Sequence, residues 1–152
     1  MPAGKASLLA GRRQQPLSES DARRAMNTFI GLDSQVAVRH MEDSRTFFHV
    51  IEIDGEQVGE IVFGSDIYPG LGVADPNSSL SMQAAAAHEL SHFYRWRDKT
   101  QIDEEDFEEI DEALTSLEAI QRFPRALSEH DNRQLVADAI QRLMLFVQRK
   151  AI

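Results

Sequence analysis

The chain has 152 residues, a formal net charge of −9 and no cysteine. Its length predicts one domain around a single core. Its acidic balance, without any basic stripe, excludes a surface built to bind nucleic-acid phosphates. Because cysteine is absent, disulfides and thiolate metal sites are excluded, and any metal must be bound by imidazole and carboxylate groups.

Hydropathy predicts no membrane-spanning segment, because no run approaches the roughly 18 consecutive apolar residues that a span requires. The apolar patch near the N-terminus, Leu8-Leu9-Ala10, is short. The core of a signal peptide takes about 7–15 apolar residues. We therefore expect a cytoplasmic protein.

The first part of the chain divides into a tail and a helix. Residues 1–16 are polar, rich in Gly, Gln and Arg, and without periodicity. This composition predicts a disordered tail, so a single folded domain is expected over 17–152. Within that domain, Ser18 or Ser20 is expected to cap a first helix that continues to about Ile30.

A strand-rich section follows. Alternation at Val36–Val38 and a run of aromatic and β-branched residues at Phe47–Ile53 predict strands. Asp54-Gly55 is a tight-turn signal, and Val58–Phe63 returns as the partner strand. We therefore predict an α+β fold in which a small antiparallel sheet, with a hairpin at about 45–63, packs against a mainly helical core.

The segment that carries chemistry is His-Glu-x-x-His, at His88, Glu89 and His92, directly after four alanines. Alanine is the strongest helix former, so a helix is expected here. Residues four apart share one face of a helix, so both histidines can bind one cation. Glu89 is rotated about 100° from His88 and lies beside the metal, where it can accept a proton from water. Two histidine ligands and a glutamate base are the roles that define the zinc-peptidase signature.

The competing interpretation is a surface helix with two solvated histidines. Leu90 and Phe93 fall on the side away from the histidines and form a plausible core face, whereas the histidine side carries mostly small residues. This distribution favours a metal site. One of the serines at 78, 79 and 81 is expected to cap the helix, and Asp98–Thr100 to end it.

Two further helices are expected. The first runs from about Asp103 to Arg122, with an apolar stripe at spacings of three and four that consists of Phe107, Ile110, Leu114 and Leu117. After Pro124, the last helix runs from about Ser128 to Arg149. Its broad apolar face predicts a brace that covers the core, formed by Leu135, Val136, Ala139, Ile140, Leu143, Phe146 and Val147.

A catalytic zinc usually has three protein ligands, and the third must be a carboxylate. Asp98 lies ten residues after His88, but Arg95 stands where such sites need a turn-permitting glycine. Glu112 and Glu118 lie on the next helix. If the Phe107–Leu117 stripe faces the motif helix, Glu118 is the better ligand. If instead Ala113, Ser116 and Ile120 face it, Glu112 is.

From about Phe47 to Pro124 the sequence resembles the gluzincin metallopeptidases, and more narrowly the small intracellular ImmA/IrrE-type peptidases. The shared features are a hairpin, the His-Glu-x-x-His helix, and a ligand helix with matching positions at Glu112-Ala113, Leu117, Ile120 and Pro124. The Asn that often follows Glu-Ala is Leu114 here, and no helix-turn-helix module is appended.

The resemblance implies a zincin-like domain that binds one Zn²⁺ per chain through His88, His92 and Glu112. Glu89 would activate the zinc-bound water as general base, and the enzyme would hydrolyse a peptide bond in a restricted protein substrate. By the same resemblance, that substrate could be a regulatory protein such as a transcriptional repressor.

Two other functions remain open on the residues alone. One is a non-catalytic, zinc-stabilised interaction domain, and the other is a metal hydrolase that acts on a non-peptide amide. A peptidase also needs a strand edge for its substrate, expected at Val58–Phe63 or around Leu71–Val73. Tyr68, His49 and Arg125 are candidates for a donor to the transition-state oxyanion.

Overall fold

The structure, a computed structural model, describes residues 12–69 and 80–151. It has the predicted α+β fold, with a mainly helical part and one small sheet. In chain order the elements, with η for 3-10 helices, are α2 (Glu19–Leu32), β1 (Ala37–His40), β2 (Phe47–Ile53), β3 (Glu56–Phe63), η2 (Ser65–Ile67), α3 (Met82–Arg97), η4 (Glu105–Phe107), α4 (Glu108–Arg122) and α5 (Glu129–Lys150).

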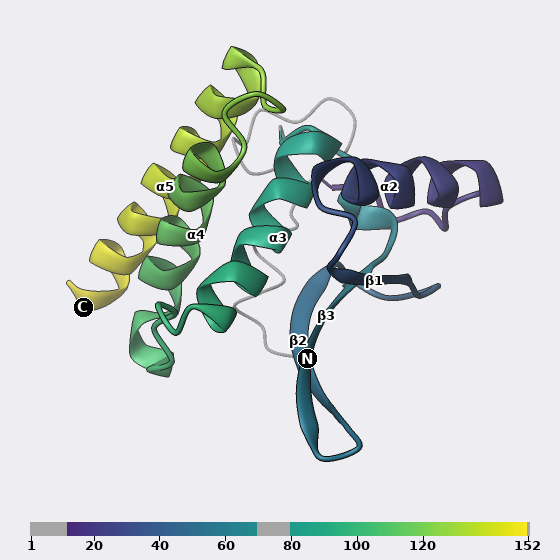
Figure 1. Cartoon of the computed structure of the whole chain (residues 1–152). Coiled ribbons are helices and arrows are strands. Elements are labelled where there is room, and N and C mark those ends of the chain that lie inside the picture. The colour runs from purple at the N-terminus through teal and green to yellow at the C-terminus, as the bar shows by residue number, and fades with distance from the viewer. Residues whose placement is uncertain (1–11, 70–79, 152) are drawn as a thin grey trace.

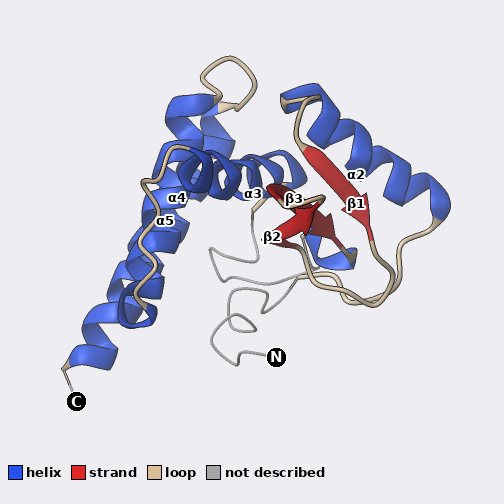
Figure 2. Ribbon diagram, turned by 60° about the horizontal axis from the view of Figure 1, so that its bottom comes forward, coloured by secondary structure: helices blue, strands red, loops and turns tan. Residues whose placement is uncertain are grey.

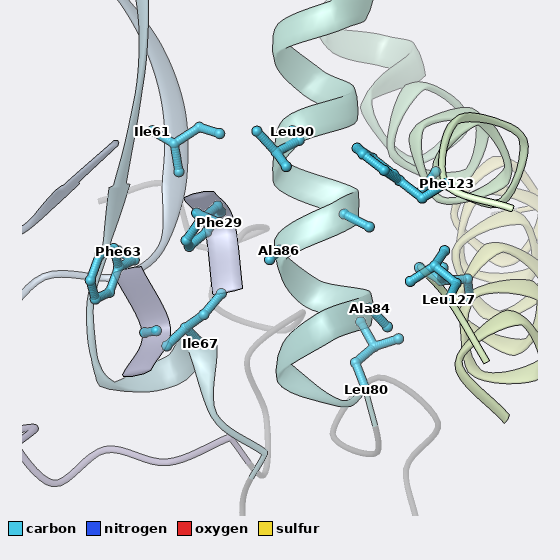
Figure 3. Packing of buried hydrophobic residues seen from close by; sticks show 14 of the residues in the cluster. Phe29, Ile61, Phe63, Ile67, Leu80, Ala84, Ala86, Leu90, Phe123 and Leu127 are labelled. Atoms are coloured by element: carbon cyan, nitrogen blue, oxygen red, sulfur yellow. The ribbon is translucent and has the colours of Figure 1, made fainter. Parts of the chain in front are cut away.

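Helix α3, which carries the His-Glu-x-x-His motif, lies in the middle of the molecule. The sheet and α2 lie on one side of it and the α4–α5 pair lies on the other (Figures 1 and 2). In the core, Phe29, Ile61 and Phe63 are on the sheet side of α3, while Phe123 and Leu127 are on the α4 side (Figure 3). The motif helix is therefore packed on two sides, which fixes its position.

The predicted hairpin is confirmed. Strands β2 and β3 pair antiparallel, with Phe47 opposite Val62 and Ile53 opposite Glu56. Asp54 and Gly55 both have positive φ, 52° and 82°, the signature of the two-residue type I′ turn that matches strand twist.

The sheet departs from the prediction in its third strand. Its order is β1-β3-β2, and β1 pairs parallel with β3, with Ala37 opposite Glu60. The sheet is therefore mixed rather than antiparallel throughout. Strand β3 pairs on both sides, so the prediction that Val58–Phe63 offers a free edge is wrong, and β2 is an edge strand instead. The other predicted edge, Leu71–Val73, lies outside the described residues.

Serine caps begin three helices. The side chains of Ser18, Ser81 and Ser128 each accept a hydrogen bond from a backbone N–H in the first turn of α2, α3 and α5. Helix α4 starts later than the predicted Asp103, because η4 precedes it. The N–H of Ile102 donates to the carboxylate of Asp111 (2.8 Å). This bond folds the segment before α4 back against the first turn of the helix, so the segment does not extend the helix.

The N-terminal boundary needs a correction. Arg12 was expected in a disordered tail, but its side chain is buried, with 5% of the residue exposed. Its guanidinium donates to three backbone carbonyls, those of Asp66 (2.8 Å), Ile67 (2.8 Å) and Leu80 (2.6 Å). Buried backbone carbonyls need hydrogen-bond donors. The sequence did not show that these three carbonyls are buried, so it gave no reason to place Arg12 in the folded domain. Residues 1–11 of the predicted tail lie outside the described part.

Helix α5 covers the core with only part of its predicted apolar face. Leu135 and Ala139 are buried, whereas Ile140 and Val147 are 52% and 63% exposed. The rest of the buried face of α5 is polar, because Asp138 and Arg142 turn inward toward α3 and α4. No helix in the described ranges is both long and apolar enough to cross a membrane.

A close approach at Gly64 joins the end of β3 to the residues before β2. A Cβ atom at Gly64 would lie 1.8 Å from the backbone oxygen of Ser44, so a side chain has no room here. The approach allows Thr46 Oγ1 to donate to Asp66 Oδ1 (2.6 Å) and to accept from the Gly64 N–H (3.2 Å). It thereby fixes Asp66 beside the start of β2.

One carboxylate joins the starts of α3 and α5. Asp131 accepts hydrogen bonds from Ser81 Oγ (2.6 Å) and from the Ser128 N–H (2.9 Å). Burial alone would raise the pKa of Asp131, but these hydrogen bonds outweigh burial and lower the pKa below its ordinary value. The ionised form is therefore the one that stabilises the fold.

We expect Asp131→Asn to lower the free energy of unfolding by about 1 kcal/mol at pH 7, because a neutral acceptor binds these donors less strongly. Since the folded-state pKa is depressed, this contribution is present above about pH 4 and is lost as the pH falls through the folded value. Urea unfolding at pH 7 and about pH 3 measures the change. The matched control is Glu129→Gln, in the same helical turn, and an equal loss in that variant would contradict the assignment.

Candidate metal centre

The two motif histidines converge on one carboxylate of the next helix. His88 Nε2 lies 2.9 Å and His92 Nε2 lies 2.8 Å from the same atom, Glu112 Oε1. The three ligand atoms all lie within 4.8 Å of one another. Among the described residues, this is the one group of three His, Asp or Glu side chains with such convergence.

The other two carboxylates considered as third ligands lie elsewhere. Glu118 is bound to Arg122 (3.1 Å) and lies 3.7 Å from Arg95. Asp98 is also bound to Arg122 (2.8 Å), on the surface. The structure therefore brings Glu112, and neither alternative, to the histidines.

The orientation of α4 explains this choice. The two leucines of its apolar stripe, Leu114 and Leu117, each remain 39% exposed, whereas Ile120 packs against the core. Its buried residues are small, and include Ala113, Ser116 and Ala119. This is the second of the two orientations considered for α4, and Glu112 is the ligand that it selects.

A buried chain of hydrogen bonds supports His88 from behind. His88 Nδ1 lies 2.8 Å from Ser116 Oγ, and Ser116 Oγ donates to Asp138 Oδ2 (2.6 Å). Arg142 Nε donates to the same Asp138 oxygen (2.7 Å), and its Nη1 lies 3.5 Å from Glu112 Oε1. The chain thus starts at one ligand and returns to another.

This chain fixes the proton on His88. Asp138 is fully buried and paired with Arg142, so it is the acceptor for the single hydroxyl proton of Ser116. The Ser116 oxygen then accepts from His88 Nδ1–H, so in the neutral imidazole the lone pair is on His88 Nε2. This nitrogen lies 2.9 Å from Glu112 Oε1. It can donate a proton to the carboxylate or, with a metal cation bound, offer its lone pair to that cation.

The charges around Glu112 are matched to such a cation. Burial alone lowers the pKa of His92, but the Glu112 carboxylate outweighs it and raises the pKa to about 9. Burial alone would raise the pKa of Glu112, but His92 and Arg142 hold it well below its ordinary value. Glu112 is therefore ionised, and a metal would replace the proton of His92.

Glu89 lies in a cleft of about 470 Å³ beside these ligands. Burial raises its pKa, and the neighbouring histidines oppose this effect. The cleft is lined by α3, by the first residues of β2, by η2, by the segment before α4 and by Arg142 of α5. A divalent metal fits the donor set, because two imidazoles and one carboxylate are the ligands of many catalytic zinc sites.

Sequence reasoning missed the supporting residues of this site. Asp138 and Arg142 are four residues apart on a helix, which is typical of a solvated ion pair. Ser116 carried no signal of its own beyond its position four residues after Glu112. Arg12 also lines the cleft, and its place in a polar, aperiodic stretch concealed it.

The three candidates for an oxyanion donor do not line the cleft. Tyr68 Oη donates to the Asp21 carbonyl (2.8 Å), and His49 Nε2 pairs with Glu60 (2.8 Å). Arg125 is exposed.

Comparison of the chain with protein-family models, with curated proteins and with solved structures finds no match. Arguments about function therefore depend on the geometry of this site.

We expect the purified protein to bind about one zinc ion per chain. Glu112→Ala should lose this ion, because it removes one of three ligands, while Glu118→Ala should retain it. Elemental analysis after incubation with zinc and gel filtration measures the ratio. Loss of zinc in Glu118→Ala alone, or no zinc in the wild type, would contradict the ligand assignment.

Ser116→Ala should weaken zinc binding about 10–100-fold, the usual effect of removing a group that orients a histidine ligand. Ser91→Ala is the matched control, because Ser91 is equally buried but donates to the Ala87 carbonyl of its own helix (2.8 Å). Competition with a chromophoric chelator gives both affinities. Equal weakening in both variants would mean that the chain from Ser116 to Asp138 does not orient His88.

Proposed function

We propose that this protein is a zinc-dependent metallopeptidase of the zincin type, the class that its motif resembles. The observation that carries the proposal is the meeting of His88 Nε2, His92 Nε2 and Glu112 Oε1 in the wall of a cleft that also contains Glu89. Three protein ligands on an accessible cleft are typical of catalytic zinc, whereas structural zinc sites are closed by four ligands.

In the proposed reaction, bound zinc supplies a Lewis acid that acidifies water and polarises the scissile carbonyl. Glu89 accepts the proton of the attacking water and then delivers it to the leaving amine. Its raised pKa supports this role, because a carboxyl group that readily holds the proton can carry it between the two steps. Ser116 and Asp138 keep the lone pair of His88 directed at the metal position.

Substrate binding is proposed at the edge of β2. Thr46, Phe47 and Phe48 line the cleft at the start of this strand. Within the described residues, β2 pairs with β3 alone, so its outer edge is available to an extended peptide. Such a peptide would bind through backbone hydrogen bonds, with side chains alternating into and out of the cleft.

The same site chemistry permits hydrolysis of a non-peptide amide, and zinc can also stabilise a fold without catalysis. The presence of Glu89 in the cleft favours catalysis, because a structural zinc has no use for a base. The regulatory-protein substrate and the cytoplasmic location remain predictions that rest on the resemblance and the composition.

The test is Glu89→Gln. We expect zinc content to be unchanged and cleavage of a randomised, quenched-fluorescent peptide mixture to fall by about 10²–10⁴-fold, the usual contribution of a general base. Glu19→Gln, on the exposed first turn of α2, is the control and should retain full activity. Full activity in Glu89→Gln would overturn the mechanism, and a zinc-loaded wild type without cleavage would favour the non-catalytic alternative.

A further inference from the structure

Some carboxylates near the candidate metal centre form ion pairs and others do not. In the segment that precedes and begins α4, Asp106 and Glu109 face α5, where Arg149 binds both and Lys150 binds Asp106. Four other acidic residues of this segment line the cleft, and within the described chain none has an ion pair or a side-chain hydrogen bond. These residues, here called the acidic end, are Asp103, Glu104, Glu105 and Glu108.

Contacts along α5 show where the acidic end lies. Asp131 binds Ser81 at the start of α3, Arg142 is beside Glu112, and Arg149 binds Asp106. At 1.5 Å per residue, Asp131 and Arg149 lie about 16 Å and about 10 Å from Arg142, in opposite directions. The acidic end is therefore on one side of the metal ligands. The cleft wall formed by Leu80 and Asp66, near the start of α3, is on the other side.

The cleft walls also contain polar atoms without hydrogen-bond partners. They are Asp66 Oδ2 and Arg45 Nη1. Asp66 is only 7% exposed, and both residues line the cleft. A buried polar atom without a partner is unfavourable. One acceptor and one donor in one cleft indicate a ligand that offers both donors and acceptors, as a polypeptide backbone does.

We propose that this cleft binds a polypeptide segment with lysine or arginine residues clustered on one side of the position that lies at the metal ligands. The basic side chains contact the acidic end, and the backbone contacts the unpartnered groups of Asp66 and Arg45. This inference rests on the proposed peptidase function and names its substrate class. The net charge of −9 acts in the same direction, because it repels acidic chains and attracts basic ones.

The experiment measures binding separately from cleavage. Zinc-loaded Glu89→Gln protein is titrated into two fluorescein-labelled decapeptides that differ only in three consecutive residues, lysine in one and glutamate in the other. Anisotropy at low ionic strength gives the affinities. A second protein also carries Asp103→Asn, Glu104→Gln, Glu105→Gln and Glu108→Gln. The matched control instead carries Glu42→Gln, Asp43→Asn, Asp54→Asn and Glu56→Gln, four exposed carboxylates near the hairpin and outside β2.

We expect the lysine peptide to bind at least about tenfold more tightly than the glutamate peptide, since several weak ion pairs add to this amount. Added salt should reduce the preference. The acidic-end variant should lose most of it and the control variant should keep it. Equal binding of the two peptides, no binding of either, or equal loss in both variants would overturn the proposal. Zinc content, measured on the same samples, shows independently whether the metal centre is intact.

Discussion

The candidate metal centre depends on how closely α3 and α4 approach each other. On α3, Ala84 and Ser91 lie on the same helix face as His88, one turn before and one turn after it. On α4, Ala113 and Ser116 occupy the buried face. Small side chains in both helices allow the short contacts of the histidines with Glu112. A larger residue at any of these positions would separate the helices and open the ligand set before it disturbed either helix.

The same approach buries charge, and the buried charges depend on one another. Asp138 is neutralised by Arg142, and Arg142 also lies beside Glu112, which in turn holds the proton of His92. An isolated ion in such a place would cost several kcal/mol. Removing one member therefore leaves an uncompensated charge, so the site and the fold around it form together. A metal bound at this site would contribute to the free energy of folding.

Local signals in the sequence predicted most of the secondary structure, apart from the start of α4. The Asp54-Gly55 turn, the serine caps and the alanine-rich motif helix each follow from a few adjacent residues. The pairing of β1 with β3 did not follow, because nothing in a four-residue strand specifies a partner far along the chain. Hydrophobic periodicity was also misleading on α4, where Leu114 and Leu117 form the regular stripe but point away from α3.

The site shows the same division between local and distant information. His88, Glu89 and His92 follow from spacing within one helix, whereas the choice of Glu112 over Glu118 required the rotation of α4 about its axis. The inward orientation of Asp138 could not be read from the sequence either, since an acidic residue four positions before an arginine is usually solvated.

The guanidinium of Arg12 gives the domain a boundary that no helix or strand marks. A fragment that began at Leu17, where the regular pattern starts, would retain every described helix and strand. It would nevertheless leave the carbonyls of Asp66, Ile67 and Leu80 without the donors that Arg12 provides. Those carbonyls belong to the wall of the cleft, so trimming the chain to its secondary structure would damage the binding surface first.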